Sequence, residues 1–299
     1  MTERIFHKLA TYLLLLLGLI SSMLTIRQRS EFGSFLGDIM RLISKKRRNI
    51  TLDNIITAFP DKPIDFCIST MKESYRNLGI TLAEILVLKR LTREQLDRYV
   101  TFEDLEDLKA TYNLRRGLIF MSGHYGNWEY MAYTVGMQMG IPITIVVKPQ
   151  KNTYADNLMN SYRTYGGNEV ISMYSAARTI VKTLLEKKVL ALLADQSATQ
   201  DKDVFVNFFG RMASTFEAPA ELALKFKVPI MMGFPIRKED GTYFIRQFHI
   251  THDDLEFSKE GIEELTRRHV AVLEQMIREY PGLWAWQHRR WKHQPQSAY

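Results

Sequence analysis

From residue 117 onward, the sequence alternates short apolar, β-branched runs with segments of helical periodicity, and this alternation restricts the possible folds more than any other feature. Strands that alternate with helices favour a mostly parallel sheet covered by helices. We therefore predict an α/β fold with a mostly parallel central sheet. The expected strands are residues 117–121, 141–149, 189–195, 228–236 and 242–250.

The N-terminus carries an uncharged apolar run, "LATYLLLLLGLISSMLTI", at residues 9–26. As a helix it would reach about 27 Å, just short of the ~30 Å hydrocarbon core of a bilayer. A membrane-inserted or membrane-lying anchor is favoured, and a buried helix or a signal sequence remains an alternative. We therefore divide the chain into a hydrophobic N-terminal anchor helix and basic segment, residues 1–50, and an α/β domain, residues 51–299.

A basic cluster follows the apolar run in "RLISKKRRN", where the candidates for lipid headgroup contact are Lys45, Lys46, Arg47 and Arg48. Basic residues beside an apolar anchor are typical of contact with anionic lipid on the cytoplasmic side, although a solvated helix face would have the same composition. The net charge of +7 also indicates an anionic partner. Nucleic acid is disfavoured because zinc-finger and aromatic RNA-binding motifs are absent from the sequence.

The chain has a single cysteine, Cys67, which excludes an internal disulfide and a cysteine-rich zinc site. The sequence has no G-x-S-x-G elbow, Walker P-loop or G-x-G-x-x-G fingerprint, so serine hydrolase and nucleotide-binding functions are disfavoured. The segment "HITHDD" could imitate a metal cluster, but side chains alternate along a strand, and a surface strand end is the preferred interpretation. We expect no metal and no cofactor.

The segment "MSGHYGNWEY" places His124 and Glu129 five positions apart, after an expected strand. Asn127 is a good N-cap for a helix that begins at Trp128, so His124 would lie in the loop and Glu129 in the first helical turn. The carboxylate could then accept the Nδ1 proton of the imidazole and leave Nε2 as a base. A turn histidine beside an unrelated, dipole-stabilising glutamate is the structural alternative.

Two further segments carry unusual residue combinations. "FVNFFGRMAST" contains Arg211 and is expected to precede a helix whose N-terminus could receive an anion, or simply to be a loop before a capped helix. "WAWQHRRWK" mixes tryptophans with Arg289 and Arg290. This mixture suits a membrane interface or a lipid phosphate, but it also suits base stacking or a packed C-terminal tail.

These motifs together resemble the bacterial late lipid A acyltransferases, the lauroyl and myristoyl transferase branch of the lysophospholipid acyltransferase superfamily. "GHYGNWE" is similar to the H-x-x-x-x-E signature of that branch. The blocks "ALLADQS", "VNFFGRMAST" and "WAWQHRRWK" follow in the family's order, and "NITLDNIITAFP" resembles the segment after the anchor. The resemblance extends from about residue 9 to residue 292.

The resemblance implies transfer of a fatty acyl group from a thioester, usually on acyl carrier protein, to a hydroxyl of a glycolipid. His124 would be the general base and Glu129 would orient and charge-stabilise it. The candidate contacts to substrate or oxyanion are Arg163, Asn127, Asp195, Gln196 and Arg211. One departure is Glu217, which stands near a position that is often small in the family.

We accordingly expect an O-acyltransferase at the cytoplasmic face of a bacterial inner membrane, acting on a lipid A precursor with an acyl thioester as co-substrate. Acylation of another glycolipid, a phospholipid or an amino-acid lipid is the alternative within the same fold. A basic membrane-binding module without catalysis is the alternative from another class. The sequence leaves the acyl-chain length, the acylated position and the oligomeric state open.

Overall fold

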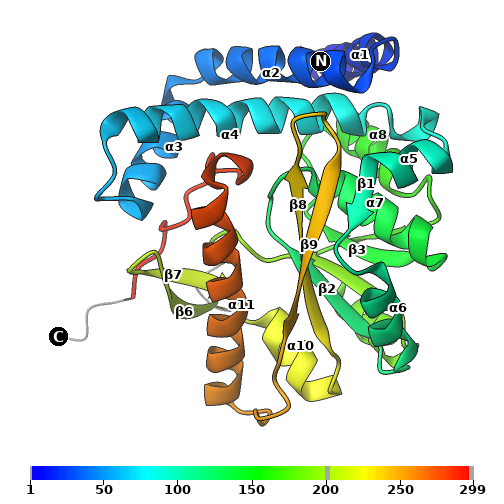
Figure 1. The fold of residues 1–299 in the computed structure, drawn as a ribbon, viewed down its shortest axis with the longest axis vertical. Coiled ribbons are helices and arrows are strands. Elements are labelled where there is room, and N and C mark those ends of the chain that lie inside the picture. Colours follow the sequence, from blue (N-terminus) through cyan, green and yellow to red (C-terminus); the bar gives the residue numbers. More distant parts are fainter. Residues whose placement is uncertain (1, 199–202, 296–299) are drawn as a thin grey trace.

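In the computed structural model, which describes residues 2–198 and 203–295, a seven-stranded sheet lies at the centre of the chain (Figure 1). Its strand order is β1-β9-β8-β2-β5-β3-β4, and every neighbouring pair is parallel except β8–β9. The strands are β1 (Val100–Phe102), β2 (Leu118–Ser122), β3 (Ile143–Val147), β4 (Glu169–Ser172), β5 (Val189–Leu193), β8 (Ile230–Arg237) and β9 (Tyr243–Ile250). The predicted α/β fold with a mostly parallel sheet is confirmed.

Helices cover both faces of this sheet, as the alternating pattern predicts. They are α3 (Lys45–Ala58), α4 (Ile64–Ile85), α5 (Arg93–Tyr99), α6 (Leu105–Asn113), α7 (Trp128–Met139), α8 (Thr153–Arg163), α9 (Ala177–Leu185), α10 (Ala218–Phe226) and α11 (Lys259–Glu279), with short 3-10 turns η1 (Leu88–Arg90) and η2 (Pro281–Leu283). Strand β2 shows how the two cores arise. Ile119 and Met121 pack with α10 and α11, whereas Leu118 and Phe120 pack with α5, α6 and α7 on the other face.

A two-stranded antiparallel hairpin, β6 (Asp203–Phe208) and β7 (Arg211–Phe216), stands apart from the main sheet and packs against α11. The sequence predicted a loop before a helix for this segment, and that prediction was wrong. The turn consists of Phe209 and Gly210, both with positive φ (56° and 76°), which is the backbone of a two-residue hairpin turn. The usual Asn-Gly signal is missing, so the sequence does not announce the hairpin.

The N-terminal apolar segment forms α1 (Thr2–Ser22), which is followed by α2 (Ile26–Ile43) after a short turn. Residues Glu3–Ser22 are long and apolar enough to cross a membrane by length and composition, and 11% of the most apolar window is buried. The helix is nevertheless attached to the domain. Arg4 Nε donates to the Tyr154 hydroxyl at 3.0 Å, and Asn152 Nδ2 donates to the His7 carbonyl at 3.1 Å, both on α8 or at its start.

Helix α2 crosses α4 at backbone contact (Figure 1). A Cβ added at Gly37 would lie 2.2 Å from the Tyr75 carbonyl oxygen, and one at Gly79 would lie 2.2 Å from the Gly33 carbonyl oxygen. Only glycine allows two helices to approach this closely. Because α4 also packs beneath the loop that follows β2, this crossing fixes the N-terminal helices relative to the candidate site.

Candidate functional site

The candidate site lies where β2 and β5, neighbouring parallel strands, end at the same edge of the sheet. His124 follows β2 after Gly123, and Asp195 follows β5. The carboxyl ends of parallel strands are where ligand sites form in open α/β sheets. His124 and Asp195 therefore meet at this edge of the sheet.

Asp195 is the hydrogen-bond partner of His124. His124 Nδ1 lies 2.8 Å from Asp195 Oδ1, and the His124 backbone N–H donates to Asp195 Oδ2 at 2.8 Å. The Trp284 indole Nε1 donates to the same Oδ2, also at 2.8 Å. Glu129 was expected to accept the Nδ1 proton, and this part of the sequence-based interpretation is wrong. The actual partner, Asp195, lies 71 positions away in the sequence, and the sheet brings it alongside His124.

The charges around His124 raise its pKa and so make it a stronger base. Burial by itself lowers the pKa of His124, but the adjacent Asp195 carboxylate, its hydrogen bond and the charge of Glu129 outweigh burial, so the pKa is raised above its ordinary value of 6.5. The pKa of Asp195 is lowered despite burial, because His124 lies beside it. An ionised Asp195 only accepts hydrogen bonds, so Nδ1 of a neutral His124 carries the proton and Nε2 presents a lone pair. The His124 side chain is 27% exposed, so a substrate can reach the ring.

Glu129 forms a bidentate ion pair with Arg163. Arg163 Nη2 lies 2.6 Å from Glu129 Oε1, and Nε lies 3.0 Å from Oε2. Arg163 Nη1 additionally donates to Asn160 Oδ1 at 2.9 Å. This geometry is a strong form of carboxylate recognition and holds Glu129 at the first turn of α7. Glu129 therefore acts on His124 through its charge, while its hydrogen bonds go to Arg163.

Asn127 caps α7, as the sequence predicts: its Oδ1 accepts from the Tyr130 backbone N–H at 2.9 Å. Its other end is also occupied, because Nδ2 donates to Glu84 Oε2 at 2.6 Å. The side chain is fully buried. The expectation that Asn127 contacts substrate or an oxyanion is therefore wrong, since both polar atoms already serve the protein.

The whole chain matches a known family. The model for bacterial lipid A biosynthesis acyltransferases matches residues 3–293. Lipid A biosynthesis palmitoleoyltransferase of Escherichia coli (strain K12) is 22% identical over 267 residues, covering 88% of this chain and 84% of the relative. Lipid A biosynthesis lauroyltransferase of the same strain is 22% identical over 269 residues, covering 90% and 86%. A lipid A biosynthesis acyltransferase of Haemophilus influenzae is 22% identical over 240 residues, covering 79% and 73%.

The chain belongs to the bacterial lipid A biosynthesis acyltransferase family. It is therefore an O-acyltransferase, and the resemblance drawn from its motifs is confirmed.

The C-terminal segment after α11 contacts His124 and Asp195 in the protein interior. The Ala285 backbone N–H donates to the His124 carbonyl at 2.9 Å, next to the Trp284 bond to Asp195. Trp284 and Trp286 are fully buried and pack edge-to-face at 4.5 Å. The segment was predicted to contact a membrane interface or a lipid phosphate, with base stacking or a packed C-terminal tail as alternatives, and the structure shows the packed tail. The contact between Trp284 and Asp195 was not predicted.

The basic residues predicted to contact lipid divide into two groups. Lys45, Lys46 and Arg47 are exposed in the first turn of α3, Arg48 is half-buried, and Arg289 is exposed. Arg290 is completely buried, so its assignment to a lipid headgroup is wrong. Its guanidinium donates to the Ser214 carbonyl and, at 2.6 Å, to the Thr215 hydroxyl, which ties the C-terminal segment to β7.

Gln196 and Arg211 are the remaining predicted contacts. Gln196 follows Asp195 and is exposed at the same sheet edge, so its role in shaping the crevice stays a prediction. Arg211 is also exposed, but it begins β7 at the turn of the hairpin, and α10 starts only at Ala218. The expected loop in which Arg211 would precede a helix N-terminus is therefore not formed.

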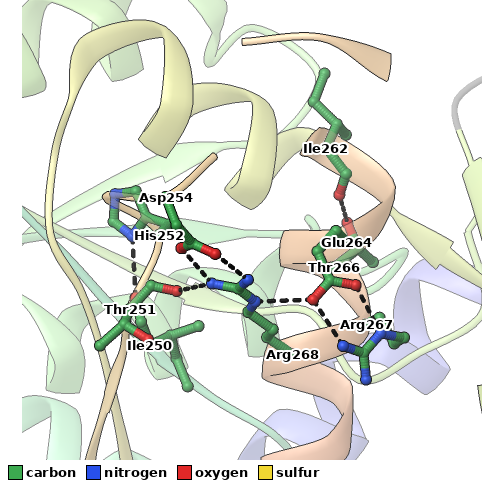
Figure 2. A network of polar contacts seen from close by, with 9 residues as sticks. All are labelled: Ile250, Thr251, His252, Asp254, Ile262, Glu264, Thr266, Arg267 and Arg268. Carbon is green, nitrogen blue, oxygen red and sulfur yellow. Dashed lines mark hydrogen bonds and ion pairs between the residues drawn. The ribbon is translucent and has the colours of Figure 1, made fainter. Parts of the chain in front are cut away.

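The residues of "HITHDD" bind separate partners (Figure 2). His249 Nε2 lies 2.6 Å from Asp107 Oδ2, and His252 Nδ1 donates to the Ile250 carbonyl at 2.9 Å. Asp254 pairs with Arg268 of α11, which also contacts Glu264, as Figure 2 shows. The segment thus fastens the connection after β9 to α11, in agreement with the preferred structural interpretation.

Proposed function

We propose that this acyltransferase moves a fatty acyl group from a thioester on acyl carrier protein to a hydroxyl of a lipid A precursor, with His124 as the general base. The observation that carries the proposal is the contact of His124 Nδ1 with Asp195, which leaves Nε2 available as a base on a side chain that is 27% exposed. The names of the relatives and of the family support the lipid A precursor as acceptor.

In the proposed reaction, His124 Nε2 takes the proton of the acceptor hydroxyl as its oxygen attacks the thioester carbonyl carbon. The tetrahedral oxyanion then collapses: the carbon–sulfur bond breaks, an ester forms, and the imidazolium returns the proton to the departing thiolate. The negative charge of Asp195 stabilises the imidazolium between these steps. No cofactor takes part, because the acyl thioester is itself the activated co-substrate.

The Glu129–Arg163 pair supports this reaction from the other side of His124. Glu129 adds negative charge that stabilises the imidazolium, consistent with its effect on the pKa of His124. Arg163 uses its Nε and one N–H of each terminal nitrogen on Glu129 and Asn160. We assign the remaining N–H groups of its terminal nitrogens to the oxyanion or to a substrate phosphate, where a guanidinium is an effective donor.

We further propose that the enzyme lies on the cytoplasmic face of the bacterial inner membrane, with α1 and α2 as its lipid-facing surface. Both helices expose large apolar side chains on the side away from the domain, among them Phe6, Leu9, Tyr12, Leu13, Leu16, Phe35, Ile39, Leu42 and Ile43. Exposed apolar surface of this extent is typical of a membrane contact. The exposed Lys45, Lys46 and Arg47 follow directly and suit anionic headgroups.

The test is acyl transfer by the full chain in detergent micelles, with mass spectrometry of the lipid product. Acyl carrier protein thioester and acyl coenzyme A are compared as donors, and a lipid A precursor is compared with a phospholipid and an amino-acid lipid as acceptors. We expect one acyl chain to be added to the lipid A precursor from the carrier protein, and no transfer by H124Q. Transfer to another acceptor alone would reject the lipid A assignment, and full activity of H124Q would reject the mechanism.

A further inference from the structure

One face of helix α4 contacts the loop that carries His124. Asn77 Nδ2 and Thr81 Oγ1 both donate to the Gly126 carbonyl, at 3.1 Å and 2.9 Å. Glu84 lies one turn further along and accepts from Asn127 Nδ2 at 2.6 Å. Residues spaced three and four positions apart share a helix face, so α4 presents three polar side chains to two consecutive loop residues.

Glu84 also belongs to a closed ring of buried hydrogen bonds. Its Oε2 accepts from the Tyr243 hydroxyl at 2.7 Å as well as from Asn127. Arg237 donates to the Tyr243 hydroxyl through Nε at 2.8 Å and to Asn77 Oδ1 through Nη2 at 2.8 Å. The chain of hydrogen bonds thus leads from Glu84 through Tyr243 of β9 and Arg237 of β8 back to Asn77 of α4. It holds the side chain of Glu84 in place.

The loop has little freedom to move away from this ring. Gly126 has φ of 53°, and a Cβ there would lie 1.8 Å from the Pro235 carbonyl oxygen, so the backbone rests directly on β8. The Gly126 N–H donates to the Leu283 carbonyl at 2.8 Å, one residue before Trp284. Movement of this loop would therefore displace Asn127 and the contact between Trp284 and Asp195 together.

Glu84 is a carboxyl group buried deep inside the protein, where a charge is costly unless it has strong partners. Burial raises the pKa of Glu84, while the positive charges of Arg237 and Arg29 and the bonds from Tyr243 and Asn127 oppose that rise. Arg29 comes from α2, where it also donates to the Ser21 and Leu24 carbonyls at 3.1 Å and 3.0 Å. Oε2 thus accepts both hydrogen bonds, Oε1 has no hydrogen-bond partner among the described residues, and the nearby cations come from α2 and β8.

We propose that Glu84 is a positioning residue for acyl transfer: it holds Asn127, and through Asn127 it sets the Glu129–Arg163 pair in place beside His124 and Asp195. The proposal rests on the catalytic roles given above to His124 and Glu129. Asn127 is the link because one end of its amide binds Glu84 and the other caps α7, two residues before Glu129. A displacement of about 1 Å at a catalytic group can cost roughly 100-fold in rate.

Three variants separate positioning from general stability. E84L removes the carboxylate, and N127S keeps an N-cap residue but removes the bond to Glu84. Both are expected to lower kcat by roughly 10- to 100-fold with little change in KM. E84Q is expected to keep most of the activity, because its amide oxygen can accept from both Asn127 and Tyr243. E73Q is the control: Glu73 is exposed on the same helix and accepts from Ser69 at 3.2 Å.

A double-mutant cycle supplies the readout that a merely structural role would not change. If Glu84 acts through Glu129, then E84L should cost little further kcat in an E129Q background, although it costs 10- to 100-fold in the wild type. Losses that multiply fully would overturn the proposal, as would wild-type kcat in N127S. Should E84L fail to fold in a thermal melt, N127S takes its place in the same cycle with E129Q and decides alone. H124Q is assayed in parallel, because activity in that variant would reject the mechanism rather than the role of Glu84.

Discussion

The substitution D195N tests the pairing that the sequence did not predict. In the wild type, Asp195 Oδ2 accepts two N–H groups, from the His124 backbone and from Trp284 Nε1, while Oδ1 accepts from His124 Nδ1. An asparagine has one carbonyl oxygen, and the two fixed N–H donors will select it for the Oδ2 position. Its NH₂ group then faces Nδ1 of His124.

An NH₂ group can only donate, so Nδ1 must become the acceptor and the proton must move to Nε2. The nitrogen that should take the hydroxyl proton is then already protonated. The variant also loses the negative charge that stabilises the imidazolium. General-base catalysis contributes about 10²–10⁴ in rate. Because D195N loses both the correct tautomer and the negative charge, the loss in rate should lie in the upper part of this range. We therefore expect kcat to fall by roughly 10³–10⁴, equivalent to about 4–5.5 kcal/mol of transition-state stabilisation.

The assay is acyl transfer under single-turnover conditions, with a thermal melt to show that D195N is folded. D254N is the matched control, because Asp254 is a surface aspartate whose partner is Arg268, and this variant should keep the wild-type rate. A rate for D195N within a few-fold of wild type would refute the role of Asp195. A larger loss in E129Q than in D195N would return the main role to Glu129.

The remaining predictions concern pH, packing and the membrane. Because the pKa of His124 is raised and the base must be neutral, kcat/KM should rise with pH through a midpoint above 6.5 and then level off. E129Q should move this midpoint to lower pH. An unchanged midpoint would show that Glu129 does not act on the histidine. G37V should destabilise the fold by about 1–3 kcal/mol in denaturant unfolding, because its Cβ would overlap the Tyr75 carbonyl. S34A on the same helix is the control. A G37V variant as stable as the wild type would contradict the close contact between α2 and α4. Deleting residues 1–24 should weaken binding to anionic vesicles in a sedimentation assay, because α1 is removed while α2 remains; undiminished binding would show that α1 is not part of the membrane contact.

Periodicity was sufficient for five of the seven strands of the sheet, because burial on both faces leaves continuous apolar strands between amphipathic helices; the short strands β1 and β4 were not predicted. It also placed His124 after one strand and Asp195 at the end of another. The pairing of these two residues could not follow from spacing, since it depends on β2 and β5 being neighbours in the sheet. The sequence contains no local sign of that order.

Composition misled the prediction where a polar side chain is buried with its partners. Arg290 looked like a surface cation beside tryptophans, yet it is enclosed and bonded to β7. Asn127 was recognised as a cap, but its second partner, Glu84, comes from a helix that ends well before the motif. Such contacts arise from tertiary packing, so only the fold reveals them.

The central claim is that neutral His124 carries its proton on Nδ1, towards Asp195, and presents Nε2 to the acceptor hydroxyl. Nitrogen-15 NMR of the histidine rings tests this most directly, with His124 assigned by comparison with H124Q. Burial lowers the pKa of His269 and of His288 to about 4, so these two rings stay neutral in the pH range where His124 titrates. The account predicts a protonated Nδ1 and a bare Nε2 at pH 8, with a pKa above 6.5; a proton on Nε2, or a pKa below 6.5, would contradict it.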